Sequence, residues 1–370
     1  MAETDGRSAP DRTRAGWRRL GVFWLTVLLL LAMGTGVIEW LGPPGAVSQG
    51  PKATSVGALH APVSPPSSEH TGVRMALQTP TPPPMTGRDT PGPVTDPDPG
   101  LLEAVEQGSK DQLPRVAHDG RAAMRLYAAG FDHGSRRPRV GILVANIGMN
   151  EAESDAAIRA LPSGVSLAVS PYATGTGRLL ATARTLGHEY LLSLPLEPTG
   201  FPLNDPGPAT LLTSAPAEAN LVKLRWAMSR FPGYVGATGI VGVMRGERLA
   251  AMTDQMDMVL SELSERGLLY VDPREARGGV TKAWGRHVDL VIDDPLDRTA
   301  IDAKLAELEQ KARDHGTALG LAMRPTPVAV ARIAAWLNGL GERGMALAPV
   351  SALALAPAEP SLKVTERRRH

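Results

Sequence analysis

The sequence predicts an α/β fold in which parallel strands, covered by helices, form a (β/α)7–8 barrel. Short, continuous apolar runs alternate with amphipathic stretches of about 10–20 residues, which is the pattern of buried parallel strands and their covering helices. Seven or eight such units fit into roughly 215 residues, which favours a closed or nearly closed barrel over an open, doubly wound sheet.

The individual elements follow from this alternation. The predicted strands are the apolar runs Val140–Ala145, Val165–Val169, Tyr190–Leu194, Tyr234–Ala237, Leu268–Asp272, Val288–Ile292, Ala318–Met323 and Ala346–Val350. The predicted helices are Glu151–Ala160, Gly177–Leu186, Pro216–Ser229, Glu247–Arg266, Arg298–His315 and Pro327–Arg343. Together they define a domain at residues 113–354.

Composition limits the classes of function. The chain has 370 residues, of which 43% are apolar, so it can bury a substantial core. A net charge of +1 from nearly equal acids and bases gives no sign of nucleic-acid binding. The absence of cysteine excludes disulfides, thiolate zinc sites and a cysteine nucleophile.

The amino-terminal residues predict a membrane anchor. Residues 1–20 form a basic tail, and residues 21–38 form an apolar run that is longer than the ~7–15 residues of a signal-peptide core. No A-x-A cleavage site follows the run, which favours a retained signal anchor over a cleaved peptide. Basic residues before the span predict a cytoplasmic amino terminus. We therefore expect a single-pass inner-membrane protein whose carboxyl-terminal domain lies in the periplasm.

Residues 39–112 are predicted to be a disordered, proline-rich linker. The chain has 33 prolines, and 15 of them lie between Gly42 and Pro114, most within this linker. Such a composition buries too little apolar surface to offset the entropy of ordering. The segment is interpreted as a spacer between membrane and domain, and a proline-rich ligand for a partner domain is the alternative. Residues 355–370 are expected to form a flexible basic tail.

Functional side chains in a barrel of this type lie at the carboxyl ends of the strands. Prolines flank Glu197 and follow Asp205, and they would hold both carboxylates on a stiff loop, suited to a catalytic role. The alternative is that these acids cap neighbouring turns or helices. The polar residues at the strand ends that we expect to bind substrate are Asn146, Ser193, Asp272, Arg274, Asp293 and Arg324.

Several loop sequences resemble one known family. They are Gly187–Pro198 (GHEYLLSLPLEP), Asn204–Pro208 (NDPGP), Leu211–Thr213, Arg225-Trp226, Pro232–Gly236, Gly267–Asp272 (GLLYVD) and Ala348–Leu353 (APVSAL). Over residues 137–353 the chain resembles the divergent polysaccharide deacetylases. The resemblance implies a deacetylase-like barrel related to enzymes that remove acetyl groups from glycans with a metal-bound water.

The same resemblance shows that the expected metal ligands are replaced. Relatives with a metal site end the first strand on an Asp-Asp pair, in which one Asp activates water and the other binds metal, and two histidines complete the site. In this chain, Ala145 and Asn146 occupy the positions of the Asp-Asp pair, and Ile240 and Met323 occupy the positions of the two histidines. Ser193 stands where relatives often carry His or Gln.

No other residues form an evident metal site in the sequence. The eight histidines show neither i, i+4 spacing nor placement at strand ends. Asp272, Asp293 and Asp294 could bind Mg²⁺ or Ca²⁺ through oxygen, but helix capping is the favoured interpretation. We expect no metal cofactor.

Two interpretations of the function stay open at this point. In the first, the chain is a membrane-tethered, catalytically degenerate deacetylase-like protein, a pseudoenzyme that binds an envelope polysaccharide or protein through the old cleft. In the second, it is an active carbohydrate hydrolase or deacetylase that uses Glu197 or Asp205 as general base without the usual metal. Convergence of Asn146, Glu197, Asp272 and Asp293 around an open cavity would favour the second.

Overall fold

A computed structural model describes residues 89–105, 111–276 and 278–357. Its main sheet has the strand order β8-β7-β6-β5-β4-β3-β10-β9, and β11 pairs with β3. Every pairing in this sheet is parallel. The strands are β3 Arg139–Ile147, β4 Ser166–Val169, β5 Tyr190–Ser193, β6 Gly236–Thr238, β7 Leu269–Glu275, β8 Gly285–Val288, β9 Leu290–Val291, β10 Thr317–Ala322 and β11 Ala346–Leu347.

One short segment nearly closes the sheet into a barrel. β8 pairs with β7 and β9 pairs with β10, and only Asp289 separates β8 from β9. The backbone N–H of Asp289 donates to the carbonyl of Leu319 (2.9 Å), whose own N–H donates to the Asp289 carboxylate (2.7 Å). Glu275 at the end of β7 accepts the N–H of Val291 (2.8 Å). The predicted barrel of parallel strands is thereby confirmed.

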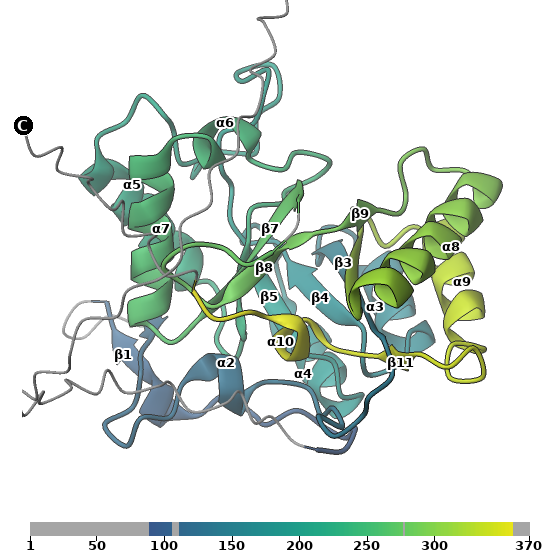
Figure 1. The fold of residues 1–370 in the computed structure, drawn as a ribbon. Coiled ribbons are helices and arrows are strands. Elements are labelled where there is room, and N and C mark those ends of the chain that lie inside the picture. The colour runs from purple at the N-terminus through teal and green to yellow at the C-terminus, as the bar shows by residue number, and fades with distance from the viewer. Residues whose placement is uncertain (1–88, 106–110, 277, 358–370) are drawn as a thin grey trace, which may run out of the picture. The chain divides into compact units, whose positions relative to one another are not determined.

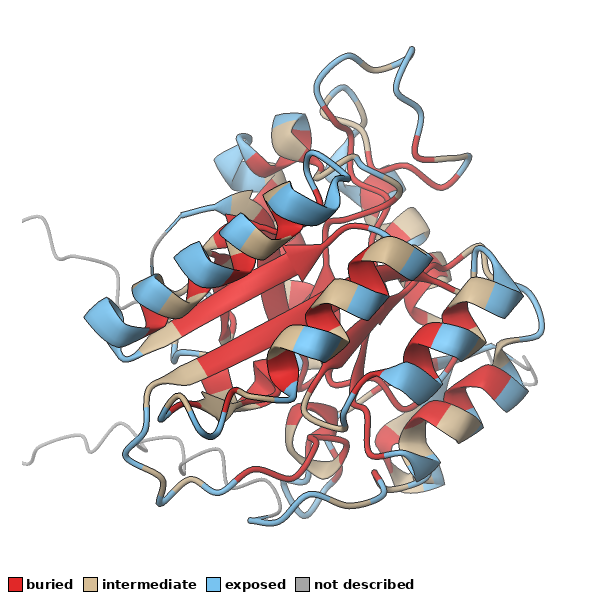
Figure 2. Cartoon of the chain, turned by 90° about the vertical axis from the view of Figure 1, so that its right-hand side faces the viewer, coloured by how far each residue is buried: buried red, intermediate tan, exposed pale blue. Residues whose placement is uncertain are grey.

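Helices cover the outside of this barrel. They are α2 Ala123–Leu126, α3 Glu151–Ala160, α4 Thr176–Thr185, α5 Ala217–Met228, α6 Glu247–Ala250, α7 Thr253–Glu265, α8 Arg298–His315, α9 Pro327–Leu337 and α10 Val350–Leu353. Figure 1 shows α5 and α7 on one side of the strands and α8 and α9 on the other. Figure 2 shows a buried sheet under helices whose outward faces are exposed, as amphipathic helices require.

The largest differences between the predicted elements and the structure concern four of them. The helix predicted at Glu247–Arg266 is divided into α6 and α7, because Met252 has an extended backbone (φ −90°, ψ 98°). The strand predicted at Val288–Ile292 is the barrel-closing segment, which begins three residues earlier and changes partner at Asp289. The run Ala346–Val350 contains only β11 before α10 begins. The helix predicted to reach Arg343 ends at Leu337, ahead of Gly339 and Gly341.

Packed structure begins earlier than residue 113, where the sequence analysis placed the start of the domain. A 3-10 helix at Pro99–Leu101 leads into the antiparallel pair β1 (Leu102–Ala104) and β2 (Gln112–Pro114). Leu101 is buried, and the N–H of Val94 donates to the carbonyl of Arg184 (2.8 Å). The end of the predicted linker is therefore part of the barrel's packing.

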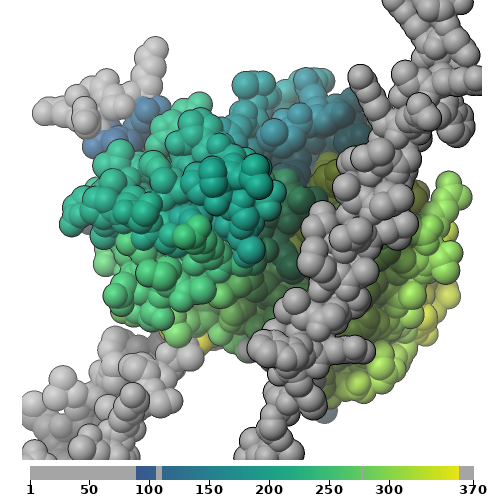
Figure 3. All heavy atoms as spheres, turned by 90° about the horizontal axis from the view of Figure 1, so that it is seen from above, coloured from purple at the N-terminus to yellow at the C-terminus, as the bar shows by residue number. Residues whose placement is uncertain are grey.

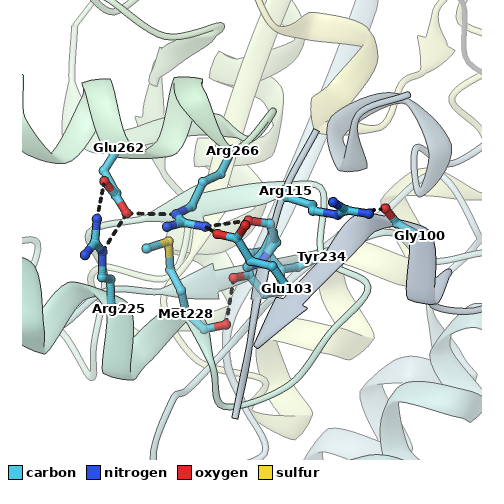
Figure 4. Close-up of polar contacts among 9 residues, drawn as sticks. Gly100, Glu103, Arg115, Arg225, Met228, Tyr234, Glu262 and Arg266 are labelled. Atoms are coloured by element: carbon cyan, nitrogen blue, oxygen red, sulfur yellow. Dashed lines mark hydrogen bonds and ion pairs between the residues drawn. The ribbon is translucent and has the colours of Figure 1, made fainter. Parts of the chain in front are cut away.

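A chain of charged groups anchors this hairpin to α5 and α7 (Figure 4). Arg266 pairs with Glu103 of β1 (2.6 Å) and donates to the carbonyl of Pro114 (2.8 Å). It also pairs with Glu262 (2.8 Å), which accepts a second bond from Arg225 of α5 (2.9 Å). Burial raises the pKa of Glu262, but the hydrogen bonds from the two arginines outweigh it and hold the pKa below its usual value.

The predicted anchor at residues 21–38 and most of the predicted linker lie outside the described residues. Within residues 89–105, 111–276 and 278–357, no helix is both long and apolar enough to cross a membrane.

Candidate functional site

The positions that correspond to the family's metal ligands meet at the carboxyl end of the barrel. α6, which follows β6, lies at the top of Figure 1, while α2 and α10 lie at the bottom. Seen from above, teal and green segments lie on one side of the molecule and a yellow-green segment lies on the other (Figure 3). We call this end of the barrel the mouth, defined by Ala145, Asn146, Ile240, Gly242 and Met323.

Asn146 connects three loops across the mouth. Its side-chain nitrogen donates to the carbonyls of Gly242 and Met323, both at 2.6 Å, and its side-chain oxygen accepts the N–H of Gly242 (2.7 Å). Asn146 has φ = 60°, a left-handed conformation that Asn tolerates better than most residues. The side chain is thereby committed to backbone groups of the loops after β6 and β10. We call these three hydrogen bonds the Asn146 clasp.

Apolar side chains fill the rest of the mouth. Ile240 and Ala145 are completely buried, and Met323 is 7% exposed. Asn146 is itself only 6% exposed. The mouth is therefore packed, and Asn146, the polar side chain among its five defining residues, is already hydrogen-bonded.

We expect Asn146→Ala to lower the free energy of unfolding by about 2–4 kcal/mol. The substitution leaves the buried carbonyl of Met323 and the half-buried backbone groups of Gly242 without this partner, and an unsatisfied buried group costs about 1–3 kcal/mol. It also places a Cβ-bearing residue in a left-handed conformation. Asn146→Gly removes the same hydrogen bonds without that strain and should cost less. Denaturant unfolding measures both, with the exposed Asn338→Ala as control; equal stability of all three variants would contradict the proposed clasp.

Asp293 supports the same region from the end of β9. Its two carboxylate oxygens accept the N–H groups of Met323 (2.8 Å) and Arg324 (3.1 Å). Burial raises the pKa of Asp293, while these two hydrogen bonds act in the opposite direction. Arg324 is exposed at the rim. The structure thus brings Asn146, Asp293 and Arg324 together around Met323.

Two hydroxyl groups lie at the ends of β5 and β6. Ser193 and Thr238 are paired across β5 and β6, and both residues are completely buried. Neither hydroxyl has a hydrogen-bond partner within the described part of the chain. Ser193 was predicted from the sequence, whereas Thr238 was not.

Asp272 and Arg274 form a second group on β7, separate from the mouth. The guanidinium Nε of Arg274 bonds both carboxylate oxygens of Asp272, at 2.9 and 3.2 Å, and its backbone N–H donates to the same carboxylate (3.0 Å). His287 of β8 places Nδ1 at 3.5 Å from Asp272. These residues line a pocket of about 250 Å³ beside α7.

Glu197 and Asp205 do not contact each other, and neither takes part in the hydrogen bonds of the mouth. The buried carboxylate of Glu197 accepts the N–H and hydroxyl of Thr213 (2.5 and 2.8 Å) and pairs with Arg248 (2.9 Å). Asp205 is exposed and accepts the N–H of Gly207 (2.9 Å), as an acid in a turn does. The Asp205 contact is the turn cap that the alternative interpretation described, whereas Glu197 joins two distant loops.

Glu189 is a buried acid that the sequence analysis did not single out. It lies just before β5 at the opposite end of the barrel and is completely buried. Its carboxylate accepts the N–H of Ala129 (3.0 Å), the hydroxyl of Ser166 (2.8 Å), and both the N–H (3.0 Å) and the hydroxyl of Ser351. Its position within a family-specific string was the available signal.

The residues present do not fit the metal site that the fold family implies. Nowhere in the described ranges do three His, Asp or Glu side chains gather closely enough to hold an ion. At the mouth, the Asn146 oxygen is occupied by Gly242, and Ile240 has no donor atom.

The fold and this mouth define a deacetylase-like α/β barrel, and sequence comparison identifies its family. The profile of the divergent polysaccharide deacetylases matches residues 142–354, and the chain belongs to this family. A crystal structure of an uncharacterized protein from Agrobacterium tumefaciens C58 is similar, with 33% identity and a TM-score of 0.59 over 66% of this chain and 99% of that one. An uncharacterized protein of Haemophilus influenzae is 26% identical over 211 residues, which span 55% of this chain and 72% of that protein.

Proposed function

We propose that the chain is a catalytically degenerate member of the divergent polysaccharide deacetylases that binds an envelope polysaccharide or an envelope protein. Residues 21–38 tether it to the inner membrane, and the barrel faces the periplasm. The observation that carries the loss of catalysis is the Asn146 clasp: a side chain in a metal-ligand position is hydrogen-bonded to two loops instead.

Without its metal ligands and its base, the barrel cannot carry out metal-dependent deacetylation. A metal-dependent deacetylase needs an ion that polarises the carbonyl and lowers the pKa of a bound water, together with a base that takes the proton. Ala145 offers no carboxylate for the base, and Ile240 and Met323 offer no imidazole. Glu197 is held by Thr213 and Arg248, and Asp205 lies in an exposed turn, so neither carboxylate is the buried, unpaired group that would suit a replacement base.

Exposed apolar side chains around the mouth support a binding role. Leu203, in the loop after β5, is 95% exposed, and Met149 and Val243, which follow β3 and β6, are 58% and 55% exposed. Each belongs to a loop at the carboxyl ends of the strands. Apolar side chains gathered on one end of a domain are typical of a contact surface.

We expect the purified full-length protein to retain no near-stoichiometric Zn²⁺, Co²⁺, Mn²⁺, Mg²⁺ or Ca²⁺ after removal of free ion, because the ligand set is missing. It should release no acetate from acetylated chitooligosaccharides above the protein-free blank. An active metal-dependent deacetylase assayed in parallel serves as the positive control. Retained metal together with metal-dependent acetate release would refute the degenerate assignment.

The tether is tested on the same protein. The full chain should fractionate with membranes, and a chain that lacks residues 1–38 should not; recovery of the full chain in the soluble fraction would count against the anchor.

A further inference from the structure

His188, which lies just before β5, is completely buried and has a carbonyl oxygen at each ring nitrogen. Its Nδ1 lies 2.8 Å from the carbonyl oxygen of Val165, and its Nε2 lies 2.9 Å from that of Ile158. A carbonyl oxygen only accepts hydrogen bonds, so both ring nitrogens have to donate. A neutral imidazole carries one ring proton, whereas the imidazolium carries a proton on both nitrogens. The two contacts together therefore require the charged ring.

The carbonyl of Ile158 needs a donor from outside its helix. Ile158 lies in the last turn of α3, and the residue four positions later, which would ordinarily donate to it, is Pro162 and has no N–H. The Nε2 of His188 supplies the missing hydrogen bond. A cation at the carboxyl end of a helix also interacts favourably with the helix dipole. The end of α3 thus favours the imidazolium both through a hydrogen bond and through its dipole.

Glu189, the next residue, provides the opposite charge. Its buried carboxylate accepts hydrogen bonds from the backbone of Ala129, the hydroxyl of Ser166, and the backbone and hydroxyl of Ser351. All four donors are uncharged, and they suit an ionised carboxylate. Acceptors around His188 and donors around Glu189 therefore favour a cation and an anion at adjacent residues, whose charges offset each other inside the barrel.

The remaining ionisable groups on the surrounding elements do not contact the ring. They are the surface pairs Asp155–Arg159 of α3 and Glu151–Arg178 between α3 and α4, Glu153 in the first turn of α3, and Arg184 of α4, which bonds Asp96 and the Tyr190 hydroxyl. Within the described ranges, no carboxylate forms an ion pair with the His188 ring. The two carbonyls, the α3 dipole and the charge of Glu189 therefore govern the protonation of this ring.

We propose that His188 is a buried imidazolium that caps α3 and acts as a pH-sensitive link between α3 and the start of β4. While both nitrogens carry protons, the ring joins the carbonyls of Ile158 and Val165. When the pH rises and one proton leaves, a nitrogen lone pair faces a carbonyl oxygen, and that contact becomes repulsive. The carboxyl end of α3 is then released from β4, at the end of the barrel opposite the mouth.

Nitrogen-15 NMR of the full-length protein, labelled at histidine, detects the protons of each ring directly. We expect His188 to carry a proton on both nitrogens at about pH 8, where an ordinary histidine, with a pKa of about 6.5, is mostly neutral. The exposed His118 provides the internal reference. The variants His188→Gln and His118→Gln assign the two sets of signals. A single protonated nitrogen in His188 at this pH would overturn the proposal.

The pH dependence of unfolding tests the consequence for the fold. Above about pH 7 histidine in the unfolded chain is mostly neutral, whereas native His188 keeps its second proton, so the native state binds one proton more. Stability therefore falls as the pH rises, and this residue should increase the unfolding constant by about 10-fold for each pH unit. His188→Gln should remove that part of the slope, and His118→Gln should keep it. Equal slopes for both variants and the unaltered protein would reject the proposal.

Discussion

The combined variant Asn146→Asp, Ile240→His and Met323→His should retain about one equivalent of Zn²⁺, whereas the unaltered chain should retain none. The three positions adjoin one another, because the Asn146 side chain bonds to the backbone of Met323 and to Gly242, two residues after Ile240. One carboxylate and two imidazoles form a three-ligand site with an open fourth position, as catalytic zinc sites have. Metal analysis and the visible spectrum of the Co²⁺ form provide the measurements.

Control variants show whether metal retention requires imidazole ligands or only polar side chains at these positions. Asn146→Asp with Ile240→Gln and Met323→Gln introduces polar side chains of similar size without imidazole, and it should retain no metal. The designed site should also raise the thermal midpoint on zinc addition, since only the folded chain presents all three ligands together. A folded His-containing variant that binds no metal would show that these three positions do not present a metal-binding geometry. Acetate release is not expected, because Ala145 still provides no base.

The sequence predicted helix bounds best where capping residues lie at the helix ends. Both bounds of α3 and α8 were predicted correctly, because each begins after a capping side chain: Asn150 accepts the N–H of Glu153, and Asp297 accepts those of Thr299 and Ala300. α8 ends at His315, just before Gly316, which adopts the left-handed conformation that terminates many helices. The barrel-closing segment was harder to predict, since the change of partner at Asp289 depends on β10, which comes later in the chain.

The candidate site was predictable as a set of positions and not as a set of contacts. Strand ends identified Asn146 and Asp293, and the family resemblance identified Ile240 and Met323 as replacements. The clasp itself joins Asn146 to residues 96 and 177 positions away, and such pairings follow from the folded loops rather than from local pattern. Asp272 and Arg274 were likewise identified, but only the structure shows that they lie in a pocket of their own beside α7.

Replacing Glu189 should produce the largest loss of stability among single substitutions considered for this barrel. Its carboxylate binds four donors from three separate parts of the chain: the segment after α2, the start of β4, and α10. Glu189→Leu leaves the buried N–H groups of Ala129 and Ser351 without an acceptor. We expect a loss of about 3–5 kcal/mol in the free energy of unfolding, because each unsatisfied buried donor costs about 1–3 kcal/mol. Denaturant unfolding of the full-length protein is the measurement.

Two further variants show whether the effect comes from the carboxylate. Glu189→Gln keeps one acceptor oxygen and the side chain's shape, so it should lie between the Leu variant and the unaltered protein. Glu265→Gln changes an exposed glutamate at the end of α7 and should shift stability by no more than about 0.5 kcal/mol. If Glu189→Leu were as stable as Glu265→Gln, the four hydrogen bonds would not hold this end of the barrel together. The family-specific strings that contain Glu189 and Ser351 would then need a reason other than stability, whereas a large loss would show that these strings preserve the barrel.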